Sequence, residues 1–322
     1  MLTFSPETAR RLRSTDHAVI VVGGGGWLGQ ATLEMLDAAL AGDMPDRVLV
    51  FGSHNRSLAL RSGRTIPCRA LEALDDLPAR PSLVLHYAFL TRDRVGTMDP
   101  DDFVRRNESI SDSVARYVER LDQGGVFLPS SGAVYRGDGI VDDDLAANPY
   151  GVLKARDERR FRGLAEDRLR ILICRLFNLA GPFINKVGSY ALSSILLDIA
   201  RGGPINLRAD RPVFRSYVHV HDIVDLAVGG LLSDLALPET AFDTAGEVVL
   251  EVGELAATAA RVLGTPEVLV NRPALISEKK DWYVGDGRRM WELMRQLGIS
   301  PAPIDVQIAD TAAYLTSVRT DQ

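Results

Sequence analysis

The sequence predicts an α/β protein whose core is a doubly wound parallel sheet, with a smaller lobe formed by the C-terminal part of the chain. Short runs rich in valine, isoleucine and leucine alternate with stretches of helical spacing through the first half, which is typical of that class. A glycine-rich turn directly follows the first such run. With 322 residues, of which 46% are hydrophobic, the chain is long enough to bury a large core.

The first strand is expected over residues 17–22, an apolar and β-branched run that ends in four consecutive glycines. Leucines then recur at helical spacing over residues 33–40. Gly23, Gly26 and Gly29 would let the backbone approach a pyrophosphate, which then lies against the amides and the positive end of the following helix. A plain tight turn is the alternative interpretation of the same glycines.

Five further strands continue the pattern, at residues 47–51, 65–68, 83–87, 126–128 and 169–176. In such a sheet ligands bind beyond the carboxyl ends of the strands, and three of these ends carry polar or small residues. These are Ser53, His54, Asn55 and Arg56 after the second strand, Ala88 after the fourth, and Ser130 with Ser131 after the fifth.

The C-terminal part is expected to form helices near residues 252–263, 291–297 and 309–318. We expect residues 1–180 with about 217–247 to form the dinucleotide-binding lobe. Residues from about 181–216, with 248–322, would form the substrate-binding lobe.

The amino-acid composition limits the classes of partner that the protein is expected to bind. A net charge of -6 and a pI near 5.5, with arginines dispersed among acids, argue against a nucleic-acid partner. No apolar run approaches the length needed to span a bilayer, and the charged N-terminal residues are unlike a signal peptide, so we expect a cytoplasmic protein. Cys68 and Cys174 fall in expected strands and are interpreted as buried hydrophobic residues.

Tyr150 and Lys154 are four residues apart, a spacing that places both on one face of a helix. Lysine occurs at only four positions, so composition alone would supply about a tenth of one such pair. Asn148 can cap a helix there, and Pro149 suits its first turn. A nearby ammonium lowers the pKa of a phenol, which would make Tyr150 a usable acid or base. An exposed helix that happens to carry both residues is the alternative.

Five segments, in this order, resemble the extended short-chain dehydrogenase/reductase family, the NAD(P)-dependent epimerases, dehydratases and reductases of nucleotide sugars. They are residues 23–29, 86–89, 130–135, 150–154 and 175–182. The resemblance covers most of the chain and implies a Rossmann-type dinucleotide-binding lobe, an enzymatic activity, and a nucleotide-sugar substrate. Members commonly pair through the helix that carries the tyrosine, so the resemblance also implies a homodimer.

The resemblance further implies roles for individual residues. Tyr150 would be the acid/base, Lys154 would hold the nicotinamide ribose and lower the tyrosine pKa, and Ser131 would hydrogen-bond the reacting oxygen. Asn178 would contact the nucleotide sugar, and Arg215 would pair with its diphosphate. The remaining cofactor contacts would come from Gly23, Gly26, Trp27, Leu28, Gly29, Ala88 and Asn107. A strand-end cap, a turn residue and a surface charge are the alternatives for Ser131, Asn178 and Arg215.

The sequence departs from the family pattern at two places, which refine the expected reaction and the expected cofactor. Dehydratases of the family carry an acid shortly before the Val134-Tyr135 pair, whereas this chain has Gly132 and Ala133. Hydride transfer at one carbinol carbon, as in an epimerase or a 4-keto-sugar reductase, is therefore favoured over dehydration. A catalytically inactive dinucleotide-binding regulatory protein is the alternative from another class.

The second departure concerns the cofactor. NAD-binding members place an acid after the second strand, where this chain has Ser53, Asn55 and Arg56. Because arginine can hold a phosphate through paired charged hydrogen bonds, we expect NADP, with NAD as the alternative. Arg56 could instead open the next helix into solvent.

His219 and His221 are expected on one face of a strand and could be half of a metal site. No third ligand has a suitable spacing, so no metal is expected.

Overall fold

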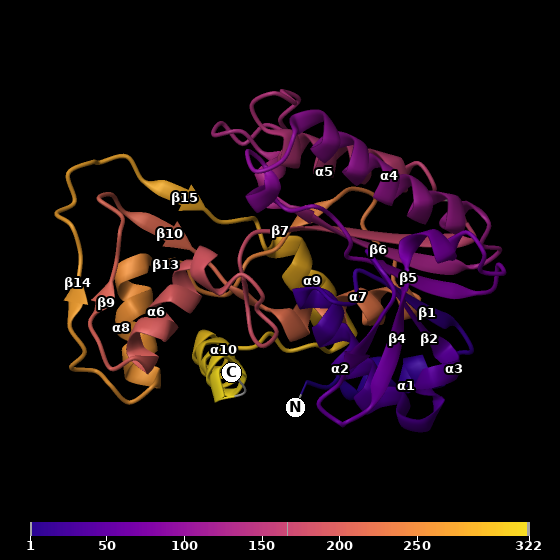
Figure 1. The fold of residues 1–322 in the computed structure, drawn as a ribbon, viewed down its shortest axis with the longest axis horizontal. Helices are drawn as coiled ribbons and strands as arrows, with labels where there is room; N and C mark the ends of the chain where they lie inside the picture. Colours follow the sequence, from indigo (N-terminus) through magenta and orange to yellow (C-terminus); the bar gives the residue numbers. More distant parts are fainter. Residues whose placement is uncertain (1, 166, 321–322) are drawn as a thin grey trace.

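The computed structural model describes residues 2–165 and 167–320, which form two lobes lying side by side (Figure 1). The larger lobe is built on one sheet. Its strands are β1 Ala18–Val22, β2 Val48–Gly52, β3 Arg56–Ala59, β4 Thr65–Ala70, β5 Ser82–His86, β6 Gly124–Ser131, β7 Leu169–Leu176 and β12 Phe242–Asp243. They follow the order β12-β7-β6-β5-β1-β2-β4-β3, and every neighbouring pair is parallel except β3 with β4. The predicted α/β class is confirmed.

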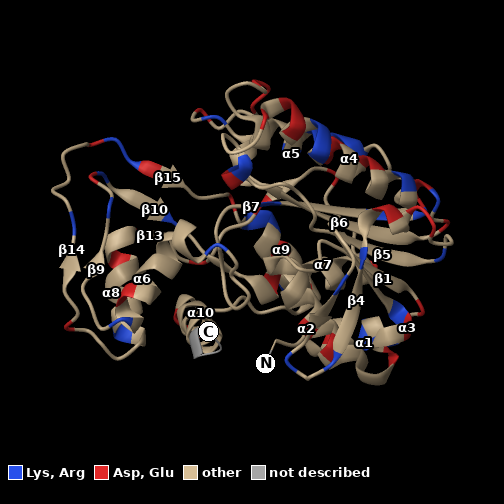
Figure 2. Ribbon diagram, in the orientation of Figure 1, with Lys and Arg blue, Asp and Glu red and all other residues tan. Residues whose placement is uncertain are grey.

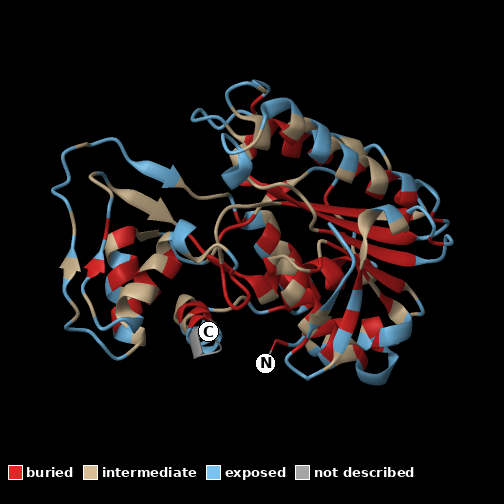
Figure 3. Ribbon diagram, viewed as in Figure 1, coloured by how far each residue is buried: buried red, intermediate tan, exposed pale blue. Residues whose placement is uncertain are grey.

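Helices cover both faces of this sheet (Figure 1). They are α2 Trp27–Leu40 and α7 Val220–Leu232 on one face, and α4 Pro100–Glu119 and α5 Pro149–Arg162 on the other. Because side chains alternate along a strand, Val19 and Val21 pack in the first core while Ile20 and Val22 pack in the second. The central strands β1, β5 and β6 are therefore buried on both sides (Figure 3).

The N-terminal segment belongs to the larger lobe. Helix α1, Pro6–Arg13, packs against α2 and α7. Its entry is fixed by Asp225, whose carboxylate accepts hydrogen bonds from the backbone N–H of Ser5 at 2.8 Å and from the Ser5 hydroxyl at 3.2 Å. Leu12 is fully buried, so the helix contributes to the core. The short helix α3, Met44–Arg47, leads into β2.

The smaller lobe combines three helices with short strands. The helices are α6 Ala191–Ala200, α8 Val252–Val262 and α10 Ile304–Thr320, and the strands are β9 Ile205–Asn206, β10 Val213–Arg215, β13 Leu250–Glu251, β14 Val270–Asn271 and β15 Asp281–Tyr283. Strand β10 pairs with β13 and β15, and β9 pairs with β14. The paired strands β8 Leu179–Ala180 and β11 Val218–His219 lie where the chain passes between the lobes.

Two details differ from the expected course of the chain. Between β2 and β4 the chain forms the edge strand β3, so Arg56 does not open a helix. Helix α9, Arg288–Leu297, falls in the segment assigned to the substrate-binding lobe but packs against α7 and β12 of the larger lobe. The proposed division at residues 180, 217 and 247 stays a prediction.

Two compositional expectations can be compared with the structure. Cys68 and Cys174 are both free and buried, as expected. Charges of both signs alternate along the exposed sides of α4 and α5 (Figure 2). None of the helices within residues 2–165 and 167–320 has the length and apolar character needed to cross a bilayer.

The N-terminal helix yields a stability prediction. Replacing Leu12 by alanine should lower the free energy of unfolding by about 2–5 kcal/mol, because the side chain is fully buried and its removal leaves a cavity. Urea unfolding followed by circular dichroism measures the change. The exposed neighbour Arg13, replaced by alanine, should change it by less than about 0.5 kcal/mol. Equal effects of the two substitutions would show that α1 is not part of the cooperative core.

Candidate active site

The glycine turn connects β1 to α2 in close contact with the strand beside it. Gly23 has a φ of +93°, and a Cβ there would lie 2.7 Å from the backbone nitrogen of Ala88. A Cβ on Gly29 would lie 2.3 Å from the Gly23 carbonyl oxygen. The N-cap residue Gly26 has no side chain, so the first amide groups of α2 have no side-chain cap. These features fit a pyrophosphate at the helix N-terminus.

Arg56 reaches this turn from β3. A Cβ on Gly25 would lie 1.7 Å from Nη2 of Arg56, which places the guanidinium directly over the glycines. The side chain of Asn55 is already used, since its Oδ1 accepts the backbone N–H of Ala70 at 2.8 Å. Ser53 is exposed, with its hydroxyl 3.0 Å from Nδ1 of His54. Of the three residues expected to hold a 2′-phosphate, Arg56 is the one brought to the turn.

Tyr150 and Lys154 lie one turn apart on α5, in the helix that the sequence predicts. Oδ1 of Asn148 accepts the backbone N–H of Gly151 at 3.0 Å, and Pro149 is the first helical residue. The ammonium of Lys154 is buried, donates to the carbonyl oxygen of Pro129 at 3.0 Å and lies 3.9 Å from the ring centre of Phe89. Both side chains line one cavity, so the interpretation as an exposed helix is wrong.

Burial dominates the protonation of this pair. It raises the pKa of Tyr150 to about 12, although the neighbouring Ser131 hydroxyl and the charge of Arg92 act in the opposite direction. It also lowers the pKa of Lys154 to about 8. The expectation that Lys154 brings the Tyr150 pKa below its ordinary value is therefore wrong for this structure. Tyr150 is a neutral phenol at pH 7.

Ser131 lies at the end of β6, between two phenols. Its Oγ accepts the backbone N–H of Ala133 at 3.1 Å, and its hydroxyl acts on Tyr150 to lower the pKa of that phenol. The second phenol belongs to Tyr283 on β15 of the smaller lobe, and the same hydroxyl acts to lower its pKa. Tyr283 packs on Phe177, with ring centres 4.8 Å apart. The site is thus closed by a residue from the second lobe.

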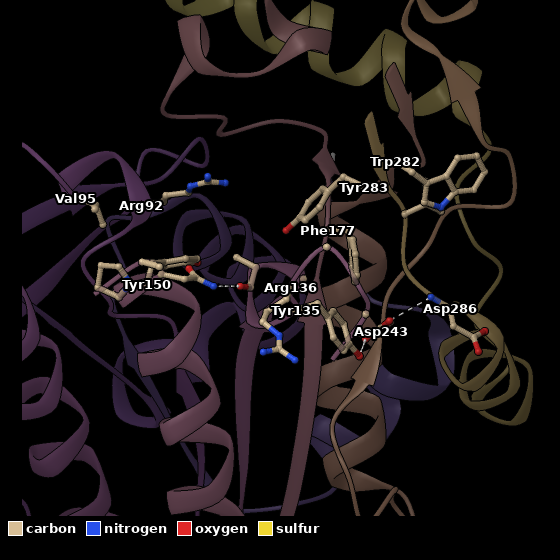
Figure 4. A pocket seen from close by; sticks show the side chains of 18 residues that line it. Arg92, Val95, Tyr135, Arg136, Tyr150, Phe177, Asp243, Trp282, Tyr283 and Asp286 are labelled. Atoms are coloured by element: carbon tan, nitrogen blue, oxygen red, sulfur yellow. Dashed lines mark hydrogen bonds between the residues drawn. The ribbon is translucent and has the colours of Figure 1, made fainter. Parts of the chain in front are cut away.

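Two cavities meet at this point. The first, of about 840 Å³, extends from Trp27 and Leu28 of the glycine turn past Lys154 to Arg215. The second, of about 890 Å³, continues beyond Tyr150 and is shown in Figure 4. Both are lined by Arg92, Ala133, Tyr150, Phe177 and Tyr283. A ligand at the shared wall can therefore contact Tyr150 and extend in either direction.

Sequence reasoning missed Arg92 and Tyr283. Tyr283 lies at the end of the three-residue strand β15, outside the five family-like segments, so no pattern pointed to it. Arg92 follows the segment 86–89 by three residues, and this proximity was the one signal that could have drawn attention to it.

The remaining site residues divide into those that line a cavity and those that support its walls. Asn178 and Arg215 line the first cavity. The side-chain nitrogen of Asn178 donates to the carbonyl oxygens of Ser216 and Tyr283 at 3.1 and 3.2 Å, and Arg215 pairs with Asp281 at 3.0 Å.

Asn107 has a supporting position. It is buried, and its Oδ1 accepts the N–H of Leu90 at 2.7 Å. Asn107 therefore fixes the loop after β5, the same loop in which Ala88 packs against Gly23. Its direct contact with the cofactor stays a prediction.

A buried polar network forms the floor of the second cavity. Arg175 on β7 makes two hydrogen bonds to Glu158 on α5, at 2.9 and 2.6 Å, and a third to the hydroxyl of Tyr135 at 2.5 Å. That hydroxyl donates to Asp243 at 2.8 Å, while Ser130 donates to Glu158 at 2.5 Å. Burial raises the pKa of Asp243. The network ties β6, β7, α5 and β12 together at one side of the second cavity, which Tyr135 and Asp243 line.

Contacts between the lobes close the other end of the site. Lys186 of the smaller lobe contacts Thr91 and Asp93 on the loop after β5. The indole N–H of Trp27 donates to the carbonyl oxygen of Pro182 at 2.7 Å. These contacts lie across the first cavity, beside the glycine turn.

The two histidines are placed differently from the expectation. His219 ends β11 and caps α7, accepting the N–H of His221 at 3.1 Å, and His221 lies in the helix. They do not share a strand face, because the chain turns into a helix between them. His221 contacts Asp222 and the carbonyl oxygen of Thr3 instead. Across the described ranges, no group of three His, Cys, Asp or Glu residues is arranged to hold a metal ion.

Comparisons with known proteins agree with this arrangement. A family model described as the NAD dependent epimerase/dehydratase family matches residues 19–233. The structure is similar to UDP-N-acetylglucosamine 4-epimerase from Methanobrevibacter ruminantium in complex with UDP-N-acetylmuramic acid, with a TM-score of 0.69 and 18% identity, covering 94% of this chain and 99% of that chain. No curated protein sequence matches.

Two further solved structures have the same fold. UDP-glucose 4-epimerase from Thermotoga maritima has a TM-score of 0.68 and 16% identity, covering 94% of this chain and 99% of that chain. A dTDP-glucose 4,6-dehydratase from Streptomyces venezuelae, solved with NAD, has a TM-score of 0.70 and 19% identity, covering 94% and 98%.

The buried Lys154 yields a prediction about stability and pH. Burial lowers its pKa from 10.5 to about 8, so below pH 8 the folded protein carries the full cost of the buried charge, about 3 kcal/mol. Lys154→Met should raise the free energy of unfolding at pH 7 by about 1–3 kcal/mol, the lost hydrogen bond to Pro129 offsetting part of the gain. The difference should shrink as the pH rises from 8 toward 10.5, because the unmodified folded protein then loses its proton first.

Urea unfolding at several pH values measures this effect. Arg156→Met, an exposed change on the same helix, should leave the unfolding free energy within about 0.5 kcal/mol. A Lys154→Met protein that is less stable than the unmodified one at pH 7 would contradict the prediction.

Proposed function

We propose that this chain, which belongs to the NAD-dependent epimerase/dehydratase family, is an enzyme that transfers a hydride at a carbinol carbon of a nucleotide sugar. The observation that carries the proposal is the meeting of Ser131, Tyr150 and Tyr283 at one wall of a cavity that begins at the glycine turn. The similar solved structures are named as 4-epimerases and as a 4,6-dehydratase of nucleotide sugars, which supports the substrate class.

The residues of the chain would divide the chemistry among them. Tyr150 would exchange a proton with the sugar oxygen, and Ser131 would orient that oxygen. Lys154, which lines the same cavity as Trp27 and Leu28, would hold the nicotinamide ribose. The bound dinucleotide supplies the hydride acceptor or donor. Asn178 would contact the nucleotide sugar, and Arg215 would pair with its diphosphate and then leave Asp281.

The protonation of Tyr150 bears on the direction of the reaction. With its pKa raised to about 12, Tyr150 carries its proton at pH 7 and is suited to donate it to a carbonyl oxygen. Reduction of a 4-keto sugar requires that direction, whereas an epimerase must use both. A 4-keto-sugar reductase and a 4-epimerase are therefore both candidates. Dehydration is less favoured, because Gly132 and Ala133 supply no second acid/base beside Ser131.

Of the two dinucleotides, we propose NADP as the cofactor. The family is described as NAD-dependent, and the similar dehydratase was solved with NAD. The guanidinium of Arg56 over Gly25 supports a 2′-phosphate at this turn, and no acid follows β2 to receive the ribose hydroxyls of NAD. The homodimer expected from the family resemblance is likewise a proposal.

Tyr150→Phe tests the assignment of the acid/base. Removing the phenol hydroxyl should lower turnover by about 100- to 10,000-fold, because proton transfer to the sugar oxygen loses its donor. The affinity for the dinucleotide should stay unchanged. Turnover is measured with the nucleotide sugar that the unmodified protein uses best, and affinity by calorimetry.

The matched control is Tyr314→Phe. Tyr314 lies on α10 and packs on Phe183. It lines neither cavity, so its substitution should leave turnover near normal. Near-normal turnover in Tyr150→Phe would remove this residue from the mechanism.

Arg56→Gln tests the cofactor proposal. The unmodified protein should bind NADPH at least about tenfold more tightly than NADH, a gap of about 1.4 kcal/mol, and the substitution should abolish that preference. Fluorescence titration with each reduced dinucleotide measures both affinities. Arg61→Gln is the control, since Arg61 stacks on Phe183 at 4.6 Å, and it should leave the preference intact. Tighter binding of NADH by the unmodified protein would establish NAD as the cofactor.

A further inference from the structure

Arg92 occupies an unusual position at the junction of the two cavities. It lies on a short turn after β5 and lines both of them. Figure 4 shows its guanidinium extending over the second cavity from the side of Tyr150 toward Tyr283. The structure gives this side chain no hydrogen bond and no ion pair with any described residue, although its charge acts on both phenols.

The other guanidinium groups that line these cavities are paired. Arg215 pairs with Asp281 at 3.0 Å, and Arg136 pairs with Asp138 at 3.2 Å. The ammonium of Lys186 likewise contacts Asp93. Among the lining residues that the structure describes, Arg92 is therefore the guanidinium without an acidic partner.

The carboxylates that line the cavities do not balance Arg92 either. Asp93 and Asp281 are the partners just named. Asp243 accepts from the hydroxyl of Tyr135, with Arg175 at 4.0 Å, and Asp286 pairs with Arg288 at 2.5 Å. The wall shared by the two cavities consequently keeps one uncompensated positive charge close to the reacting groups.

We propose that Arg92, together with the hydroxyl of Tyr283, binds a carboxylate carried by the sugar, so that the substrate is a nucleotide-activated hexuronic acid. The inference rests on the proposed function, which places the reacting oxygen of the sugar at Tyr150 and Ser131. In a hexuronic acid reacting at carbon 4, the carboxylate is attached to the next ring carbon. The carboxylate therefore lies close to the reacting oxygen, on the wall where Arg92 and Tyr283 face each other. Arginine suits this group because its planar fork matches a carboxylate in two parallel hydrogen bonds.

Matched pairs of ligands test the proposal. Calorimetry with the dinucleotide-loaded protein compares UDP-glucuronic acid with UDP-glucose, and the hexuronate with the neutral hexose in the dTDP and GDP series. For the nucleotide that binds best, the hexuronate should bind about 10- to 100-fold more tightly than the hexose, the range expected for charged hydrogen bonds. Arg92→Gln should abolish this preference while leaving the affinity for the neutral sugar within about twofold.

Two controls make the outcome specific. Arg94→Gln removes the same charge from the same turn, at a residue that lines neither cavity, and should keep the preference. Arg92→Lys, which retains the charge but not the fork, should keep part of it. The affinity of the Arg92→Gln protein for the dinucleotide alone should equal that of the unmodified protein.

Three outcomes would overturn the inference. Equal or tighter binding of the neutral hexose would show that no carboxylate is recognised. Weakened dinucleotide binding in Arg92→Gln would assign Arg92 to the cofactor instead. Absence of binding by all six nucleotide sugars would reject the proposed function itself, which distinguishes that failure from the failure of the subsite alone.

Discussion

The central constraint on this protein is that its parallel sheet must be buried on both faces. Parallel neighbours require a connection that crosses over the sheet, and these crossings place α2 and α7 on one side and α4 and α5 on the other. All parallel strands then end at the same edge. The glycine turn after β1, the loop after β5 and Ser131 at the end of β6 meet there for that reason alone. The site is a consequence of the topology before any individual side chain is considered.

The polar groups beneath the site show how the chain stabilises a buried charge close to that edge. Lys154 enters an apolar environment in which the carbonyl oxygen of Pro129 and the face of the Phe89 ring are its nearest partners. Glu158, one turn further along α5, is held by Arg175 and Ser130. The helix therefore carries Lys154 on a segment that is fixed by buried hydrogen bonds, which limits the movement of Tyr150 as well.

Much of this could be predicted because it depends on local patterns. The alternation of apolar runs, the glycine turn, and the Asn148 cap with Pro149 determine their own backbone conformation, and the structure confirms them. The protonation of Tyr150 could not be predicted, because it depends on how many atoms surround the phenol and not on its spacing from Lys154. Arg92 and Tyr283 come from segments that approach each other only in the folded chain. The edge strand β3 also escaped prediction, since four mostly exposed residues carry no alternating pattern.

Two contacts between the lobes would affect how quickly a bound dinucleotide leaves. They are those of Lys186 with Thr91 and Asp93, and of Trp27 with Pro182. They join the two lobes across the cavity beside the glycine turn, so separation of the lobes would have to break both. The residence time of a dinucleotide bound there would then depend on how often the lobes separate as well as on its own contacts. Because the Lys186–Asp93 pair is partly exposed, dissolved salt weakens it. Cofactor exchange in this protein should accordingly be faster in concentrated salt than in dilute buffer.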